Sequence, residues 1–204
     1  MEDLKQLLSC LNAESDVKTI TETFEDIANI LLFKSYIKTD YGNYRILEIE
    51  FYFWNNNHKD NLTIKRTEDE DEGMWWLHEW GVDLSFKSSF SNSSKCKQFY
   101  GGVLIRSMIK INDNQSDKHE AIYGPRNCCE YLFYSSALKS NNAPQIVVND
   151  EREQHIGQLD SDKRYFSGDP KDTDGEYRDS KYRFYVNGIK LAIPSSYKKA
   201  SPWK

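Results

Sequence analysis

The sequence predicts a single mixed α/β domain (mixed α+β), in which N-terminal helices lead into a sheet built from hairpins. The first observation is the length of 204 residues, which fits one domain. The second observation is the helical spacing of apolar residues near the start of the chain, and the third is the alternation of apolar residues further on. Aromatic residues make up 14% of the chain, which can build a core with few aliphatic side chains. No linker rich in Pro, Gly or Ser divides the chain, so residues 1–204 are treated as one domain.

Three segments are predicted to be helices. Residues 2–12 and 19–34 carry apolar side chains at three- and four-residue intervals, which is typical of amphipathic helices. Residues 124–138 begin with a Gly-Pro pair, a frequent start of a helix, and place Leu132 and Phe133 inward.

The strands are predicted from alternation. Residues 40–43 read Asp-Tyr-Gly-Asn, a hairpin turn signal between two alternating runs. In the second run, 45–54, one face is apolar and is expected to be core, with Leu47, Ile49, Phe51 and Phe53. The other face carries Ile46, Glu48, Glu50, Tyr52 and Trp54. Two carboxylates beside two aromatic rings suit either a solvated sheet face or a lined cleft.

The rest of the chain alternates between loops and strands. Residues 55–73 are polar and predicted to be loop, including the five consecutive acids 68–72. Residues 99–111 read as a buried strand with Arg106 at its centre. Residues 149–181 are acidic and loop-rich, and 181–194 are predicted to form a strand, a turn and a second strand.

The composition and the charge distribution limit the partners and the cellular location that we expect for the protein. The net charge of −5 is uneven, with −10 over residues 1–85 and +5 over residues 86–204. A basic side of this kind can dock on phosphate, although a solvated surface explains the same charges. Because no apolar run approaches the roughly 20 residues of a membrane span and no basic signal-peptide head is present, we expect a cytoplasmic protein with no membrane partner.

No motif in the sequence predicts a metal or cofactor site. The four cysteines are too few and too unevenly spaced for a zinc site or a disulfide framework, and no Gly-rich phosphate loop occurs. We therefore expect no cofactor and no metal. The chemistry is left to carboxylates, aromatic rings and a few basic groups.

Five fragments in order over about residues 20–190 resemble the methylpurine-DNA glycosylases, also called alkyladenine or 3-methyladenine DNA glycosylases. The family's R-I-V-E-x-E-A-Y strand is similar to Arg-Ile-Leu-Glu-Ile-Glu-Phe-Tyr at 45–52. The other fragments are Trp-Gly-Val at 80–82, Val-Leu-Ile-Arg at 103–106, Gly-Pro-Arg-Asn-Cys-Cys at 124–129, and Gly-Glu-Tyr-Arg at 175–178 with Arg-Phe-Tyr-Val-Asn-Gly at 183–188. The resemblance implies a curved, mainly antiparallel sheet with flanking helices, and a monomer that excises damaged purines from double-stranded DNA in base excision repair.

The resemblance also implies a role for individual residues. Glu50 matches the glutamate that activates water, and Arg106 matches the arginine that holds that water and the carboxylate. Tyr52 matches the tyrosine that stacks on the flipped base, His58 is the nearest counterpart of a stacking histidine, and Trp80 stands where the family has its DNA wedge. We expect phosphate contacts from the basic side, at Lys87, Lys95, Lys97, Lys198 and Lys199.

Other interpretations remain open at this point. Arg106 could instead be a structural ion-pair partner of Glu48 or Glu50. Trp80, like other tryptophans, could belong to the core, and a Trp80 sealed in the core could not be a wedge. The whole chain could be a member of the family that lost catalysis and binds nucleic acid or protein, or a hydrolase of another N-glycosidic substrate.

Overall fold

The computed structural model describes residues 2–90, 98–111, 121–134, 142–149, 157–166 and 177–203. Two helices open the chain, α1 (Glu2–Cys10) and α2 (Val17–Phe33). A short third helix, α3 (Pro125–Cys129), continues into a π-helical turn at Glu130–Tyr134. The strands are β1 (Ser35–Thr39), β2 (Gly42–Trp54), β3 (Trp75–His78), β4 (Gly81–Ser85), β5 (Tyr100–Ile111), β6 (Ala121–Tyr123), β7 (Gln145–Val148), β8 (Gln158–Asp162) and β9 (Arg183–Asn187).

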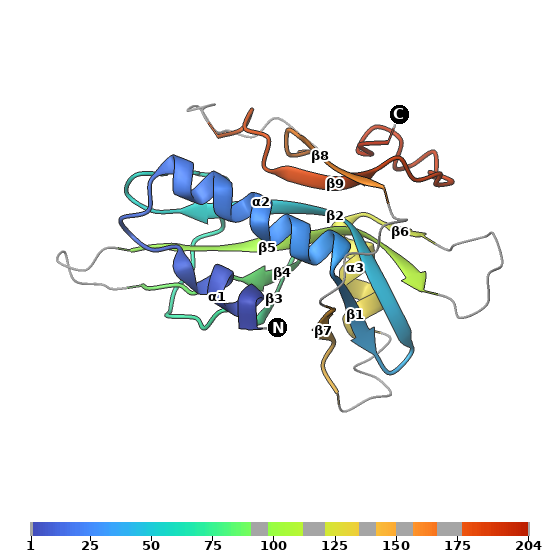
Figure 1. Cartoon of the computed structure of the whole chain (residues 1–204), viewed down its shortest axis with the longest axis horizontal. Helices are drawn as coiled ribbons and strands as arrows, with labels where there is room; N and C mark the ends of the chain where they lie inside the picture. Colours follow the sequence, from blue (N-terminus) through green and yellow to red (C-terminus); the bar gives the residue numbers. More distant parts are fainter. Residues whose placement is uncertain are drawn as a thin grey trace.

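The predicted mixed α+β domain is confirmed, with one strongly curled antiparallel sheet at its centre. The main path through the sheet runs β3-β4-β5-β2-β1-β7, while β9 pairs with β2 and β8 pairs with β9 (Figure 1). The long β2 thus has β5 along one edge and β1, then β9, along the other. Every residue that we predicted to carry chemistry on strand 45–54 therefore lies at the middle of the sheet.

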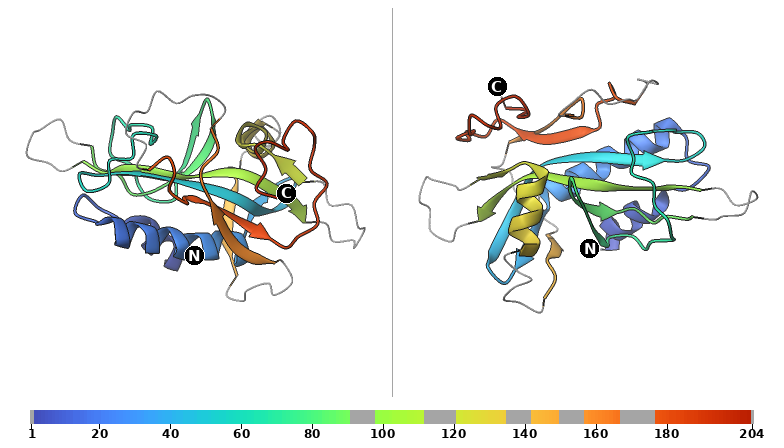
Figure 2. Two further views of the ribbon diagram at one scale, coloured as in Figure 1. Left: turned by 90° about the horizontal axis from the view of Figure 1, so that it is seen from above. Right: turned by 180° about the vertical axis from the view of Figure 1, so that it is seen from behind.

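The helices α1 and α2 cover one face of the sheet, and the β3–β4 hairpin and α3 project from the other (Figure 2). Asp16 begins α2 by accepting a hydrogen bond from the backbone N–H of Thr19, so the helix starts two residues earlier than predicted. The Phe24 ring of α2 stacks on the Phe51 ring of β2 with centroids 4.4 Å apart. This aromatic packing lies in the main core, which leaves the opposite sheet face for the site.

A β-bulge changes the predicted alternation in β2. Leu47 on β2 and Arg106 on β5 have no register partner, and the pairing shifts on either side of Glu48. As a result Ile46, predicted on the Glu48 face, joins Ile49 in the main core. Leu47 is buried, as predicted for a core residue, but it lies outside the cluster that holds Ile49.

Other segments also differ from the predictions. Residues 158–162, predicted as loop, form β8, because they pair with β9 along its whole length. Of the two strands predicted within 181–194, only β9 forms, and residues 188–194 have no strand structure. Within the described ranges, no helix is both long and apolar enough to cross a membrane.

The aromatic packing of α2 against the sheet gives a test of the core. Phe51 is fully buried, so Phe51→Ala should lower the free energy of unfolding by about 3–5 kcal/mol, through lost burial and the cavity left behind. Urea denaturation monitored by circular dichroism measures this. Leu77→Ala is the control, because Leu77 is 51% exposed and should change stability by less than about 0.5 kcal/mol. Equal effects of the two substitutions would contradict this packing.

Candidate active site

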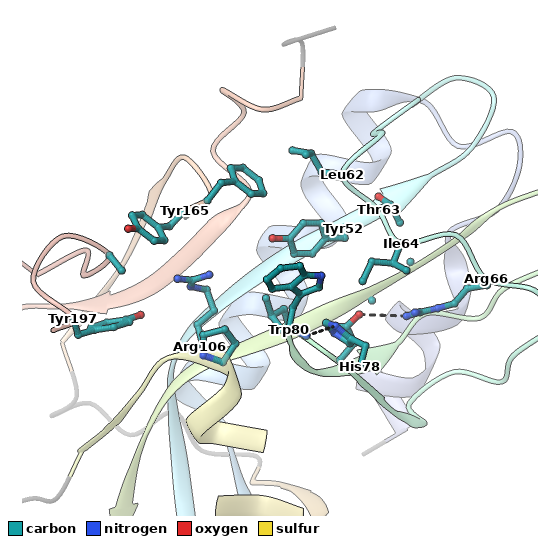
Figure 3. Close-up of a pocket in the computed structure, with 17 residues that line it drawn as sticks. Tyr52, Leu62, Thr63, Ile64, Arg66, His78, Trp80, Arg106, Tyr165 and Tyr197 are labelled. Carbon is teal, nitrogen blue, oxygen red and sulfur yellow. Dashed lines mark hydrogen bonds and ion pairs between the residues drawn. The ribbon is translucent and has the colours of Figure 1, made fainter. Parts of the chain in front are cut away.

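A pocket of about 550 Å³ opens on the sheet face opposite the helices. The size falls within the range of about 300–1,000 Å³ that is common for small-molecule sites. Side chains of Tyr52, Trp80, Arg106, Tyr165 and Tyr197 point toward this common space from five separate parts of the chain (Figure 3). We call it the aromatic pocket.

Glycines on β5 form part of the pocket floor. Gly102 pairs with Tyr52 across the β2–β5 ladder, and a Cβ on neighbouring Gly101 would stand 2.2 Å from the carbonyl oxygen of Tyr52. A side chain at Gly101 is therefore excluded by backbone. The absence of a side chain at Gly102, which pairs with Tyr52, leaves the Tyr52 ring beside an open floor, where a flat molecule could stack on it.

Four buried charged residues lie beneath the pocket, and we call them the charge cluster: Glu48, Glu50, Arg106 and Arg183. Arg106 bridges both carboxylates, with its Nε 3.0 Å from Glu48 Oε1 and its Nη1 3.0 Å from Glu50 Oε2. Arg106 thus pairs with both Glu48 and Glu50, which the sequence offered as alternative partners. The Nε of Arg183 reaches the same Glu48 oxygen at 2.7 Å. Each buried charge therefore has a partner of opposite sign, which offsets much of the cost of burial.

The carboxylate of Glu50 is fully enclosed. Its Oε2 accepts hydrogen bonds from Arg106 and from the hydroxyl of Tyr52 at 2.8 Å, and its Oε1 accepts one from the backbone N–H of Tyr165 at 2.7 Å. Glu50 is 0% exposed and does not line the pocket. The groups that stand between it and the pocket are Arg106 and Tyr52.

The cluster raises the pKa of both groups that stand over Glu50. Burial alone would lower the pKa of the Arg106 guanidinium, but the charges of Glu50 and Glu48 raise it well above its ordinary value. Burial and then the charge of Glu50 raise the pKa of Tyr52 well above its ordinary value. At neutral pH the pocket therefore presents a fixed cation and a protonated phenol.

Buried contacts on two sides hold the outer walls of the pocket. The hydroxyl of Tyr197 donates to Glu48 Oε2 at 2.7 Å, and Arg183 donates to the carbonyl oxygen of Ala200, so the C-terminal turn is tied to the charge cluster. On the other side, Arg164 forms a bidentate pair with Asp60 at 2.6 and 3.0 Å. That pair anchors the segment carrying Tyr165.

The β3–β4 hairpin supplies the remaining wall. His78 Nε2 lies 3.1 Å from Asp83 Oδ1, and Arg66 Nη2 lies 3.3 Å from Asp83 Oδ2. The guanidinium of Arg66 also lies over the Trp76 ring, with its carbon 3.3 Å from the ring centroid. Among the described residues that line the pocket, Asp83 is the only acidic one.

The predicted residues fall into three groups. Tyr52, Arg106 and Trp80 line the aromatic pocket with Glu50 beneath them, and Trp80 is 52% exposed at the pocket edge rather than sealed in the core. Exposed Lys198 and Lys199 follow Tyr197, which lines the pocket, whereas exposed Lys87 lies beside α1, its backbone N–H bound to Leu8. Lys95 and Lys97 lie outside the described residues.

The prediction for His58 is wrong. His58 is 0% exposed, and its two ring nitrogens lie 2.7 Å from the Phe53 carbonyl oxygen and 2.9 Å from the Tyr182 hydroxyl. Burial lowers its pKa below the ordinary value, so the ring is neutral. A ring enclosed in this way cannot stack on an incoming base, and it braces the loop after β2 instead.

Comparison with known proteins finds one distant relative of similar length. Uncharacterized protein L759 of Acanthamoeba polyphaga mimivirus is 27% identical over 206 residues, which cover 86% of this chain and 92% of that protein. No protein-family model matches the chain. The likeness extends over most of both chains and carries no named activity.

Sequence reasoning missed several residues of the site. Tyr165 lies in the segment read as acidic and loop-rich, and Tyr197 follows the last predicted strand. Both meet the pocket through long-range contacts with Glu50 and Glu48. Asp83 follows Gly81 in a short alternating run, Gly-Val-Asp-Leu-Ser, where an acid between two apolar residues was an available signal.

The buried hydroxyls predict a loss of stability in alkali. Burial and Glu48 raise the pKa of Tyr197, and burial and Asp160 raise that of Tyr185 to about 12. Above about pH 10 the unfolded chain loses these protons while the folded chain keeps them, so stability is intact below pH 10 and falls as pH rises toward 12.

Substituting Tyr197 with Phe tests this dependence. Urea unfolding across this pH range should show a shallower decline in Tyr197→Phe than in wild type, by up to about 1.4 kcal/mol per pH unit, because one group no longer titrates. Parallel declines in the two proteins would show that Tyr197 does not keep its proton in the folded state.

Proposed function

We propose that this protein is a monofunctional N-glycosidase that binds a base extruded from duplex DNA in the aromatic pocket and hydrolyses its bond to the sugar. The observation that carries the proposal is the convergence of Tyr52, Arg106 and Trp80 on one pocket above Glu50. A flat pocket, a buried carboxylate–arginine pair and an exposed aromatic wedge are the parts that base excision requires.

Tyr52 and Glu50 together provide a route for the proton of the attacking water. Water adds to C1′ of the sugar, the bond from C1′ to the base nitrogen breaks, and the electron pair leaves with the base, which takes up a proton from the solvent. Since Glu50 is enclosed, the proton released by the water reaches it through the Tyr52 hydroxyl, which donates to Glu50 Oε2 at 2.8 Å. Arg106 stabilises the negative charge on Glu50 before that transfer.

Trp80 and the neighbouring cations suit the DNA backbone. The Trp80 ring lies at the end of the β3–β4 hairpin, with the Arg126 guanidinium 5.5 Å from its centroid. Arg126 is exposed and donates to the carbonyl oxygen of Glu79, which holds it beside the ring. Trp80 can fill the gap that an extruded base leaves, while Arg126, Lys198 and Lys199 contact phosphates.

A second candidate function is base binding without hydrolysis. The enclosure of Glu50, with hydrogen-bond donors on both oxygens, favours this reading because no carboxylate oxygen of Glu50 faces the pocket. Incubation with duplexes that carry a single hypoxanthine, ethenoadenine or 7-methylguanine distinguishes a glycosidase from a base-binding protein. Release of a base supports the glycosidase, and tight binding with no release supports the binding protein.

Glu50→Gln separates catalysis from binding. We expect this variant to release no base from any duplex that the wild type cleaves, because an amide cannot take up the proton. Affinity for the same duplex should be unchanged or higher, since one negative charge is removed. Strand incision after alkali treatment and fluorescence anisotropy measure the two properties.

Two further variants make the result specific. Glu22→Gln, on an exposed position of α2, is the matched control and should behave as wild type. Tyr52→Phe keeps the stacking ring but breaks the proton route, so it should bind normally and release base slowly. Full excision by Glu50→Gln would rule out Glu50 as the proton acceptor.

Trp80→Ala tests the wedge. It should weaken binding to a duplex with an abasic analogue more than binding to undamaged DNA, because only the first contains a gap to fill. Leu77→Ala, another exposed position on the same hairpin, should leave this preference unchanged.

Lysine substitutions should behave differently from Trp80→Ala. Lys198→Ala and Lys199→Ala should weaken binding to both duplexes about equally and each reduce the slope of log affinity against log salt by about 1. Anisotropy titrations at several salt concentrations measure this. A wedge assignment fails if Trp80→Ala weakens both duplexes to the same degree.

A further inference from the structure

Asp83 is the acid of the aromatic pocket, whereas Glu50 lies beneath it. Asp83 lines the pocket with 5% of its surface exposed, and the rings of Tyr52, Trp80 and Tyr165 line the same pocket. A carboxylate in such surroundings accepts hydrogen bonds and donates none. A molecule that fills the pocket therefore has to offer donors to Asp83, or leave the remaining acceptor positions of a desolvated carboxylate without a partner.

The protein itself uses only part of the capacity of this carboxylate. His78 Nε2 lies 3.1 Å from Oδ1, and Arg66 Nη2 lies 3.3 Å from Oδ2. Each carboxylate oxygen can accept a further hydrogen bond, since an ionised carboxylate has about four acceptor positions. His78 Nδ1 is 3.3 Å from the backbone N–H of Trp80, so both ring nitrogens are engaged and the ring fixes the orientation of Asp83.

The position of Asp83 relative to Tyr52 decides which part of a ligand it meets. A Cβ on Gly102 would stand 2.9 Å from Asp83 Cβ and 3.1 Å from its Oδ2, so the side chain leans over Gly102. Gly102 is the ladder partner of Tyr52. The carboxylate thus lies beside the Tyr52 ring, at the edge of any flat base that stacks on it.

The chemistry is on the opposite side of that base. Leu104 pairs with Asp83 on one side and with Glu50 on the other, so the two carboxylates stand two strands apart, on either side of Leu104. Arg106 and the Tyr52 hydroxyl contact Glu50. A base on Tyr52 therefore meets Asp83 with one edge while the Glu50 side is left for its sugar.

We propose that Asp83 is the specificity-determining residue of the pocket, and that it selects a guanine-type base by accepting hydrogen bonds from its N1–H and 2-amino groups. Two neighbouring N–H donors match the two oxygens of one carboxylate, as in other bidentate pairings with charged acceptors. Hypoxanthine offers only the N1–H, and adenine offers only its 6-amino group. This inference rests on the proposed function in one respect, that a base occupies the pocket.

Binding of free nucleosides tests the proposal independently of excision. The probes are 2′-deoxyguanosine and 2′-deoxyinosine, which differ by the 2-amino group alone, and isothermal titration calorimetry measures the dissociation constants for the full chain. We expect 2′-deoxyguanosine to bind wild type at least tenfold more tightly than 2′-deoxyinosine. Equal binding, or no binding of either nucleoside, overturns the proposal without any variant.

Asp83→Asn then assigns the preference to this side chain. An amide supplies one acceptor and one donor, so the variant should lose most of the tenfold preference. Asp179→Asn is the matched control, because Asp179 is an exposed acid that pairs with Lys163 and does not line the pocket. It should keep the preference, and a preference retained by Asp83→Asn would overturn the assignment.

Gly102→Ala tests the role of Asp83 without removing a charge. Its added Cβ displaces the Asp83 carboxylate, so the ratio of the two dissociation constants should fall toward one.

Excision assays on DNA are scored separately from nucleoside binding. A preference for 2′-deoxyguanosine without excision of any base would contradict the glycosidase and support guanine selection by Asp83. Excision without that preference would support the glycosidase and contradict guanine selection by Asp83.

Discussion

The burial of two carboxylates on one strand is the constraint on which the rest of the structure depends. Glu48 and Glu50 are fully enclosed, and a buried carboxylate without a cation would cost several kcal/mol. Arg106 contacts both, and Arg183 contacts Glu48. The β-bulge makes this possible, because it lets consecutive residues of β5, Arg106 and Ser107, both reach Glu48.

The same contacts position the walls of the aromatic pocket. Tyr52, Tyr165 and Tyr197 each use a polar group on Glu48 or Glu50, so three rings from distant segments are oriented by two carboxylates. The charge cluster therefore contributes to the shape of the pocket as well as to its electrostatics. Loss of either glutamate would change both at once, which is why the amide substitution is more informative than alanine.

The acidic groups of the site differ in their access to the aromatic pocket. Glu50 is shielded from the pocket by Arg106 and Tyr52, which both donate to its Oε2, and this suits a carboxylate that receives a proton through Tyr52. Asp83 faces the pocket and is oriented by His78 and Arg66, which suits recognition.

Local patterns determined most of the elements. Helical spacing predicted α1 and α2, the turn signal at 40–43 predicted the β1–β2 hairpin, and alternation predicted β2 and β5. Glu50, Tyr52, Arg106 and Trp80 were found as candidates because they lie in strong strand patterns or match the motifs of one family. Tertiary structure decided the features that local sequence patterns do not specify. The bulge that moves Ile46 into the core, the burial of His58, and the meeting of Asp83, Tyr165 and Tyr197 at one pocket all depend on contacts between residues far apart in the chain. Periodicity reports which face a residue occupies within one strand, and it carries no information about which distant segment covers that face.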